Sequence, residues 1–134
     1  MTYYDDLTEY SYWTRVSGGN RGEQALNVGW LDGAHPFRTG TLPLKLGERL
    51  LELCRRPCNL TRGFHVCTVC PPADRDEHRV RWTALTGTMI GNGEIRVTGP
   101  SGSLYAAPTL IVHYTHEHNY LPPRDFVEGV LARR

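Results

Sequence analysis

The chain has 134 residues and a mass of 15.2 kDa, the size of one ordinary domain, so we expect a single compact domain over residues 1–134. Its hydrophobic share of 40% and charged share of 22% are typical of a soluble globular protein. The 15 Lys and Arg residues nearly balance the 14 Asp and Glu residues, giving a formal net charge of +1. Proteins that bind nucleic acids or membrane surfaces usually carry a clear excess of one sign, so we expect neither partner.

The amino-terminal segment MTYYDDLTEY contains acidic residues but no basic one, and no apolar run follows it. It therefore lacks the pattern of a secretory signal. No stretch approaches the roughly 18 apolar residues of a membrane span. We expect a cytoplasmic protein, in which the four cysteines are reduced thiols or metal ligands and not disulfides.

The first part of the chain predicts one strand and one helix. Residues 25–31, ALNVGWL, alternate apolar and polar side chains and predict a strand, and the following AHPFRTG predicts a loop. TLPLKLGERLLELC predicts a helix that Thr41 caps, with Pro43 in the first turn and Pro57 after its end. Its apolar residues recur at helical spacing and include Cys54, for which we expect core packing.

The second part predicts short strands, one hairpin and two helices. Residues 59–67 and the run VRWTALTG each predict a strand, and GNGEIRV and SLYAA predict a hairpin around GPSG. PTLIVHYTHEHNY predicts a helix ended by Asn119, although its β-branched run also fits a strand. PPRDFVEGVLARR predicts a terminal helix. GNGEIR lacks the third glycine of a dinucleotide fingerprint, so we expect no nucleotide cofactor.

Two segments carry the residue types of a metal site. Cys67 and Cys70 form a CxxC knuckle, whose short spacing lets one turn direct both sulfurs to the same ion. His113 and His118 have a spacing that zinc fingers use at a helix end. Five residues on a helix amount to about 140° of rotation, so the two imidazoles converge only if the last turn tightens. These four residues predict a structural Zn²⁺ site.

Other ligand sets compete with this one. His65 shares a face with Cys67 if the segment is extended, so it is a substitute ligand, and His116 lies one turn after His113. Cys58 forms a second pair with the cysteine four residues before it, but a proline interrupts that pair. The cysteines and histidines also fit a metal-free fold. A redox role for CxxC lacks the following helix and the βαβ pattern.

A catalytic zinc would need an open coordination position and a general base. Glu117 and Asp32 are the candidate bases of a small zinc-dependent hydrolase. The deaminase pattern H-x-E followed by P-C-x-x-C is absent, and so is HExxH. Arg55, Arg56 and Arg62 cluster near a predicted helix end, where they are typical of a solvated turn and not of a nucleic-acid contact.

Several blocks resemble a family of small bacterial proteins of uncharacterised function. The blocks are NVGWLDGAHPF, TRGFHVCTVC, GNGEIRV, YAAPTLIVHY and HNYLPPRDFVEGV, and the family motifs are GWLDG, GFHxCxxC, GNGEIRV and HYxxxHxYxPPxxF. The resemblance covers nearly the whole chain. It places recurring histidines on His65, His113 and His118 and recurring cysteines on Cys67 and Cys70. His116 and Cys58 fall outside the motifs, and the resemblance implies no particular reaction.

We therefore expect an α+β fold in which a small antiparallel sheet packs against two or three helices. One zinc ion would cross-link the structure. The expected function is that of a non-enzymatic binding or regulatory protein with a protein partner. One alternative is the zinc-dependent hydrolase with Glu117 or Asp32 as base. The other is a metal-free module that binds a ligand or protein through GWLDGAHPF, with Trp30, His35 and Phe37 as an aromatic wall. For Trp30 and Phe37 we expect core packing instead.

Overall fold

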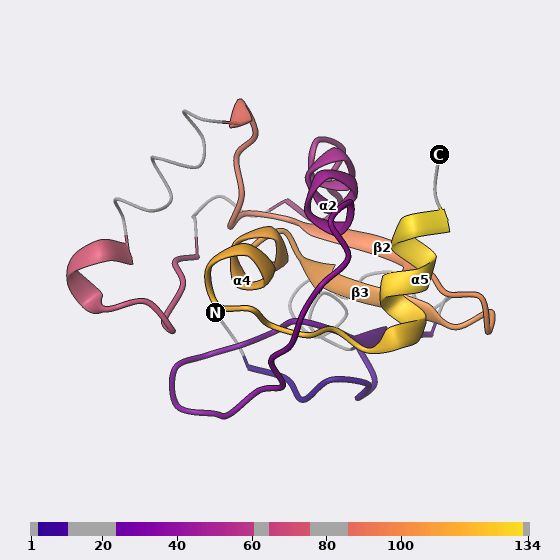
Figure 1. Ribbon diagram of the computed structural model, residues 1–134, viewed down its shortest axis with the longest axis horizontal. Helices are drawn as coiled ribbons and strands as arrows, with labels where there is room; N and C mark the ends of the chain where they lie inside the picture. The colour runs from indigo at the N-terminus through magenta and orange to yellow at the C-terminus, as the bar shows by residue number, and fades with distance from the viewer. Residues whose placement is uncertain (1–2, 11–23, 61–64, 76–85, 133–134) are drawn as a thin grey trace.

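The computed structural model describes residues 3–10, 24–60, 65–75 and 86–132. Within these ranges the chain forms a small sheet and three α-helices, so the predicted α+β class is confirmed. The described elements, shown in Figure 1, are β1 (Ala25–Asn27), α2 (Leu46–Cys54), the 3₁₀ turn η1 (Pro72–Asp74), β2 (Glu94–Thr98), β3 (Leu104–Pro108), α4 (Ile111–Glu117) and α5 (Arg124–Ala132).

The sheet has the order β1-β3-β2 and is mixed. β2 and β3 form the predicted antiparallel hairpin, in which Ile95 lies opposite Ala107. β1 runs parallel to β3, with Leu26 opposite Tyr105, so the sheet is not purely antiparallel as expected. Parallel neighbours need a long crossover connection, and the chain between β1 and β3 supplies one that contains α2 and β2.

Two predicted boundaries differ from the structure. β1 ends at Asn27, because Gly29 turns the chain with a φ of +79°. α2 begins at Leu46 and has no side-chain cap, so the predicted capping role of Thr41 is wrong. A turn precedes the helix instead, closed by the bond from the Leu46 amide to the carbonyl of Pro43. Residues 59–60 and 65–67 form no strand, and VRWTALTG lies almost entirely outside the described residues.

The helices and the sheet share one apolar core. α2 contacts both α4 and α5, and α5 packs on β2 (Figure 1). Leu46, Leu50 and Cys54 form the buried face of α2 at four-residue spacing. The thiol of Cys54 donates to the carbonyl of Thr109 at 3.7 Å, which confirms that this cysteine packs in the core.

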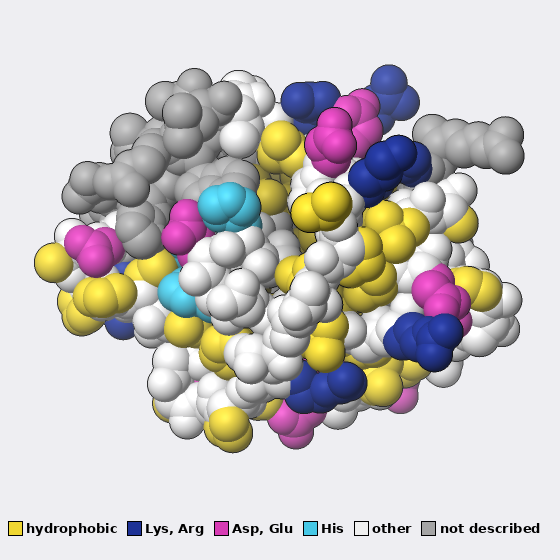
Figure 2. Space-filling model, viewed as in Figure 1, with side chains coloured by type: hydrophobic (Ala, Val, Ile, Leu, Met, Phe, Trp, Pro, Cys, Tyr) yellow, Lys and Arg dark blue, Asp and Glu magenta, His cyan; other side chains and the backbone are white. Residues whose placement is uncertain are grey.

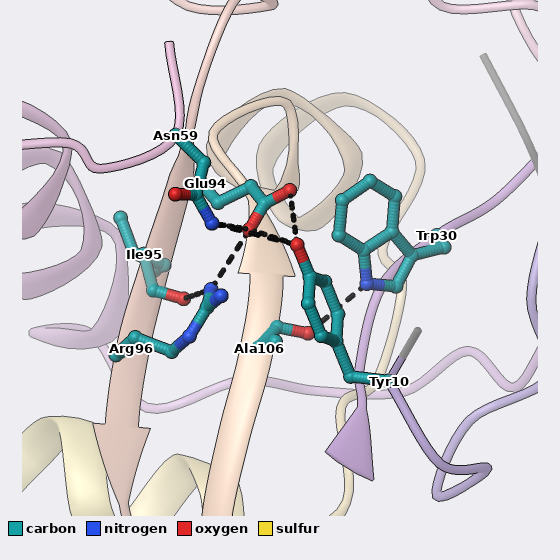
Figure 3. A network of polar contacts seen from close by, with 7 residues as sticks. All are labelled: Tyr10, Trp30, Asn59, Glu94, Ile95, Arg96 and Ala106. Carbon is teal, nitrogen blue, oxygen red and sulfur yellow. Dashed lines mark hydrogen bonds and ion pairs between the residues drawn. The ribbon is translucent and has the colours of Figure 1, made fainter. Parts of the chain in front are cut away.

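A buried polar network anchors the start of β2 (Figure 3). The Glu94 side chain is 3% exposed, and its carboxylate accepts hydrogen bonds from the Tyr10 hydroxyl at 2.8 and 2.9 Å. Asn59 Nδ2 and Arg96 Nη1 each donate to Glu94 Oε1 at 2.9 Å. Because the carboxylate is both hydrogen-bonded and paired with a guanidinium, its charge is tolerated inside the protein. The network joins the amino-terminal segment to the sheet.

The surface carries mixed charge. On the face shown in Figure 2, basic and acidic side chains are interspersed, in keeping with the net charge of +1. No helix among the described residues is long and apolar enough to cross a membrane.

Candidate metal centre

The two predicted segments meet at one point in the structure. The ligand atoms of Cys67, Cys70, His113 and His118 all lie within 4.8 Å of one another. Nε2 of His118 lies 3.3 Å from the sulfur of Cys67 and 3.4 Å from that of Cys70, and Nε2 of His113 lies 3.2 Å from the sulfur of Cys70. Sulfur and nitrogen ligands of one tetrahedral zinc ion are separated by about 3.5 Å. The spacing is therefore compatible with a shared metal ion.

The end of α4 brings the two histidines together. His113 lies inside the helix, whereas His118 follows its last residue with φ −117° and ψ 6°, outside the helical conformation. Asn119 then adopts the predicted left-handed conformation, with φ 53°. The amides of His118 and Tyr120 both donate to the carbonyl of Tyr114, at 3.1 and 3.2 Å, and so close this turn. The imidazole centroids are consequently 5.1 Å apart.

Most of the site is closed to solvent. Cys67, Cys70 and His113 are 4%, 2% and 2% exposed, and His118 is partly buried. Burial, and next the neighbouring sulfur of Cys67, raise the pKa of the Cys70 thiol to about 12. Without a cation this thiol stays protonated at neutral pH. A metal ion that binds here must therefore displace its proton.

Arg75 and Gly33 hold the knuckle through hydrogen bonds that sequence reasoning missed. Arg75 donates from Nε to the carbonyl of Cys70 and from Nη2 to the carbonyl of Thr68, both at 3.1 Å. The amide of Gly33 donates to Thr68 Oγ1 at 3.0 Å. A Cβ at Gly33 would lie 2.3 Å from the Thr68 carbonyl oxygen, so only glycine allows this approach. The GWLDG segment thus packs directly on the knuckle.

A family model described as "Domain of unknown function (DUF7919)" matches residues 2–131. The chain belongs to this family. No curated protein matches the chain, and no solved structure does. Membership agrees with the expected resemblance to a small uncharacterised family, and it assigns no reaction or ligand to the cysteine and histidine cluster.

The other candidate ligands lie outside the cluster in this DUF7919 chain. The group of described residues that could hold an ion does not include His65, whose amide donates to the carbonyl of Gly91 at 2.7 Å and whose pKa is lowered by burial. His116 is exposed and pairs with Glu117 at 3.3 Å. Cys58 is exposed and lies outside the cluster as well.

Trp30 and Phe37 pack inward as expected, so the aromatic wall of the alternative interpretation does not form around the GWLDGAHPF loop. Trp30 is 3% exposed and donates from Nε1 to the carbonyl of Ala106 at 3.0 Å, and Phe37 packs against the core. His35 is exposed, and its Nδ1 lies 2.6 Å from Asp32 Oδ1. This hydrogen bond lowers the pKa of Asp32. The loop therefore presents an oriented carboxylate and imidazole, with its large rings turned inward.

Proposed function

We propose that this DUF7919 protein is a small zinc-binding domain in which a structural Zn²⁺ joins the knuckle to α4. Cys67, Cys70, His113 and His118 would be its ligands. The observation that carries the proposal is the convergence of four donor atoms within 4.8 Å from two segments far apart in the chain. Two thiolates and two neutral imidazoles are a donor set typical of structural zinc, and they neutralise the ion.

The number of ligands favours a structural role over a catalytic one. Four protein ligands fill a tetrahedral zinc, whereas catalytic sites keep one position for water or substrate. The proposed bases give the hydrolase little support, because neither Glu117 nor Asp32 belongs to the cluster of possible metal ligands, which already supplies four donor atoms. The zinc ion would instead order residues 65–75 against the helix, and structural zinc contributes an apparent ~10–16 kcal/mol in small domains.

We further propose a non-enzymatic role in binding or regulation, with a protein as partner. It is supported by the near-neutral net charge of +1 and by the mixed charges of the surface in Figure 2. A surface of this kind has no strong field that would attract nucleic acid or an anionic membrane.

The test is the metal content of protein purified without a histidine tag. We expect about one zinc per chain, the stoichiometry of a closed site. The Cys67→Ser and His118→Ala variants should lose the zinc, and the His65→Ala and His116→Ala variants should keep it. A folded wild-type protein without metal would contradict the proposal. Zinc loss in His65→Ala but not in His118→Ala would show that His65 is a ligand in place of His118.

A further inference from the structure

A hollow of about 460 Å³ is lined by residues of both the knuckle and the GWLDG segment. Three separate parts of the chain line it: the loop, the knuckle and the segment after η1. The lining residues are Leu31, Asp32, Gly33, Ala34, Thr68 and Arg75. None of them supplies a ligand atom to the cysteine and histidine cluster, so the hollow is distinct from the metal centre.

Arg75 is fixed in place on one side of this hollow. Two of its five N–H groups are used in bonds to the carbonyls of Thr68 and Cys70, which hold the guanidinium plane in a defined orientation. Among the described residues, no carboxylate pairs with Arg75. An oriented guanidinium can bind the carboxylate of a small molecule through the N–H groups that these two bonds do not use.

Asp32 brings the opposite charge to the same hollow. Its Oδ1 accepts hydrogen bonds from His35 Nδ1 at 2.6 Å and from the Ala34 amide at 3.0 Å, and the side chain is 28% exposed. Asp32 and Arg75 form no ion pair with each other, although both line the hollow. A simple anion would be repelled by Asp32, and a simple cation by Arg75.

We propose that the hollow binds a small zwitterion, with its carboxylate on Arg75 and its ammonium group on Asp32. Leu31 and Ala34 offer apolar contact for the carbon atoms between the two charges. The chemical class is that of amino acids and short peptides, and the volume falls in the range of small-molecule pockets. The inference deepens the proposed binding function, since the zinc knuckle supplies the Thr68 and Cys70 carbonyls that orient Arg75.

The test is an NMR titration of ¹⁵N-labelled, zinc-loaded protein. The probes are glycine, β-alanine and glycylglycine, three zwitterions of increasing charge separation. Acetate, which has only the carboxylate, and methylammonium, which has only the ammonium group, are the controls. We expect at least one zwitterion to give saturable shifts of the Gly33, Ala34 and Thr68 amides. Acetate and methylammonium should each bind more than about tenfold more weakly. The absence of saturable shifts with all three zwitterions, or equal binding of acetate, would overturn the inference.

Two variants separate this inference from the proposed function. Asp32→Asn keeps an acceptor for the Ala34 amide but removes the charge, so it should weaken zwitterion binding with zinc retained. Arg75→Gln should also weaken binding, and Arg55→Gln, at an exposed pair with Glu52, is its matched control. Wild-type affinity in Asp32→Asn would overturn the inference even if Arg75→Gln loses zinc. Zwitterion binding by a protein that purifies without zinc would contradict the proposed function and leave the zwitterion site standing.

Discussion

The Sγ atom of Cys70 lies 3.2 Å from Nε2 of His113, although 43 residues separate the two in the chain. Both side chains are 2% exposed. Residues 67–70 belong to no helix or strand, so side-chain contacts with α4 and backbone contacts with Arg75 hold this segment in place. We therefore expect the stability of this segment to depend on a metal ion bound between the sulfurs and the imidazoles.

Removal of the metal should destabilise the protein strongly. His113→Ala leaves at most three ligands, and we expect it to lower the free energy of unfolding by more than about 4 kcal/mol, as the loss of a structural metal does. Excess chelator should have a similar effect on the wild type. Urea unfolding measures both changes. His116→Ala, at an exposed position, should change stability by no more than about 0.5 kcal/mol. A wild-type transition that chelator leaves in place would contradict this prediction.

The buried thiol of Cys54 should make stability fall at alkaline pH. Burial raises its pKa from the ordinary 9.0 to about 12, so the folded state holds this proton more tightly than the unfolded state. The resulting stabilisation is complete below pH 9 and is lost as the pH rises toward 12. At about 1.4 kcal/mol per pKa unit, it amounts to at most about 4 kcal/mol.

Cys54→Ala lacks this proton and provides the comparison. The stability difference between wild type and Cys54→Ala should shrink as the pH rises above 9.0, the ordinary pKa of the thiol, which unfolding curves at several pH values measure. A difference that stays constant from neutral to strongly alkaline pH would show that the thiol is not protected by burial.

The ionic network at β2 predicts that loss of the Glu94 charge lowers stability strongly. Glu94→Gln leaves the Arg96 guanidinium without its partner and should cost about 3–5 kcal/mol of stability. Tyr10→Phe removes the hydroxyl that donates to the same carboxylate and should cost about 1.5–3 kcal/mol. Glu52→Gln breaks an exposed pair with Arg55 and should cost no more than about 1 kcal/mol. Thermal or urea unfolding of the three variants gives the order, and equal effects of Glu94→Gln and Glu52→Gln would refute it.

Two glycine substitutions should change the stability of the protein in opposite directions. Gly33→Ala would place a Cβ 2.3 Å from the Thr68 carbonyl oxygen, so the loop must move away from the knuckle, at a cost of about 1–3 kcal/mol and with weaker zinc binding. Gly47→Ala adds a Cβ in α2 with nothing within 4 Å and should stabilise the protein by up to about 1 kcal/mol. Unfolding curves and zinc competition with a chelator measure both variants. Unchanged zinc affinity in Gly33→Ala would contradict the supporting role of the loop.

Several features set by local sequence were predicted correctly. Leu46, Leu50 and Cys54 repeat at helical spacing and do form the buried face of α2. The GPSG turn fixes the β2–β3 hairpin, and Asn119 ends α4 in the left-handed conformation. The convergence of cysteines and histidines was also predictable, because a CxxC turn and the end of a helix restrict where their side chains point.

Other features set by contacts between distant segments were not predicted. The parallel pairing of β1 with β3 depends on how the chain crosses between them. The three residues of β1 do not indicate the direction of pairing. Arg75 follows the knuckle in a polar run, where an arginine is unremarkable until its donors meet the carbonyls of Thr68 and Cys70. Glu94 likewise reads as an exposed strand residue until Tyr10 and Arg96 enclose it.

X-ray absorption at the zinc edge, on protein purified without a histidine tag, tests the central claim most directly. We predict about one zinc per chain with two sulfur ligands at about 2.3 Å and two nitrogen ligands at about 2.0–2.1 Å. That result would establish a closed site built by Cys67, Cys70 and two imidazoles. A shell with fewer than two sulfurs, a water oxygen in place of one imidazole, or a folded protein without metal would contradict the account.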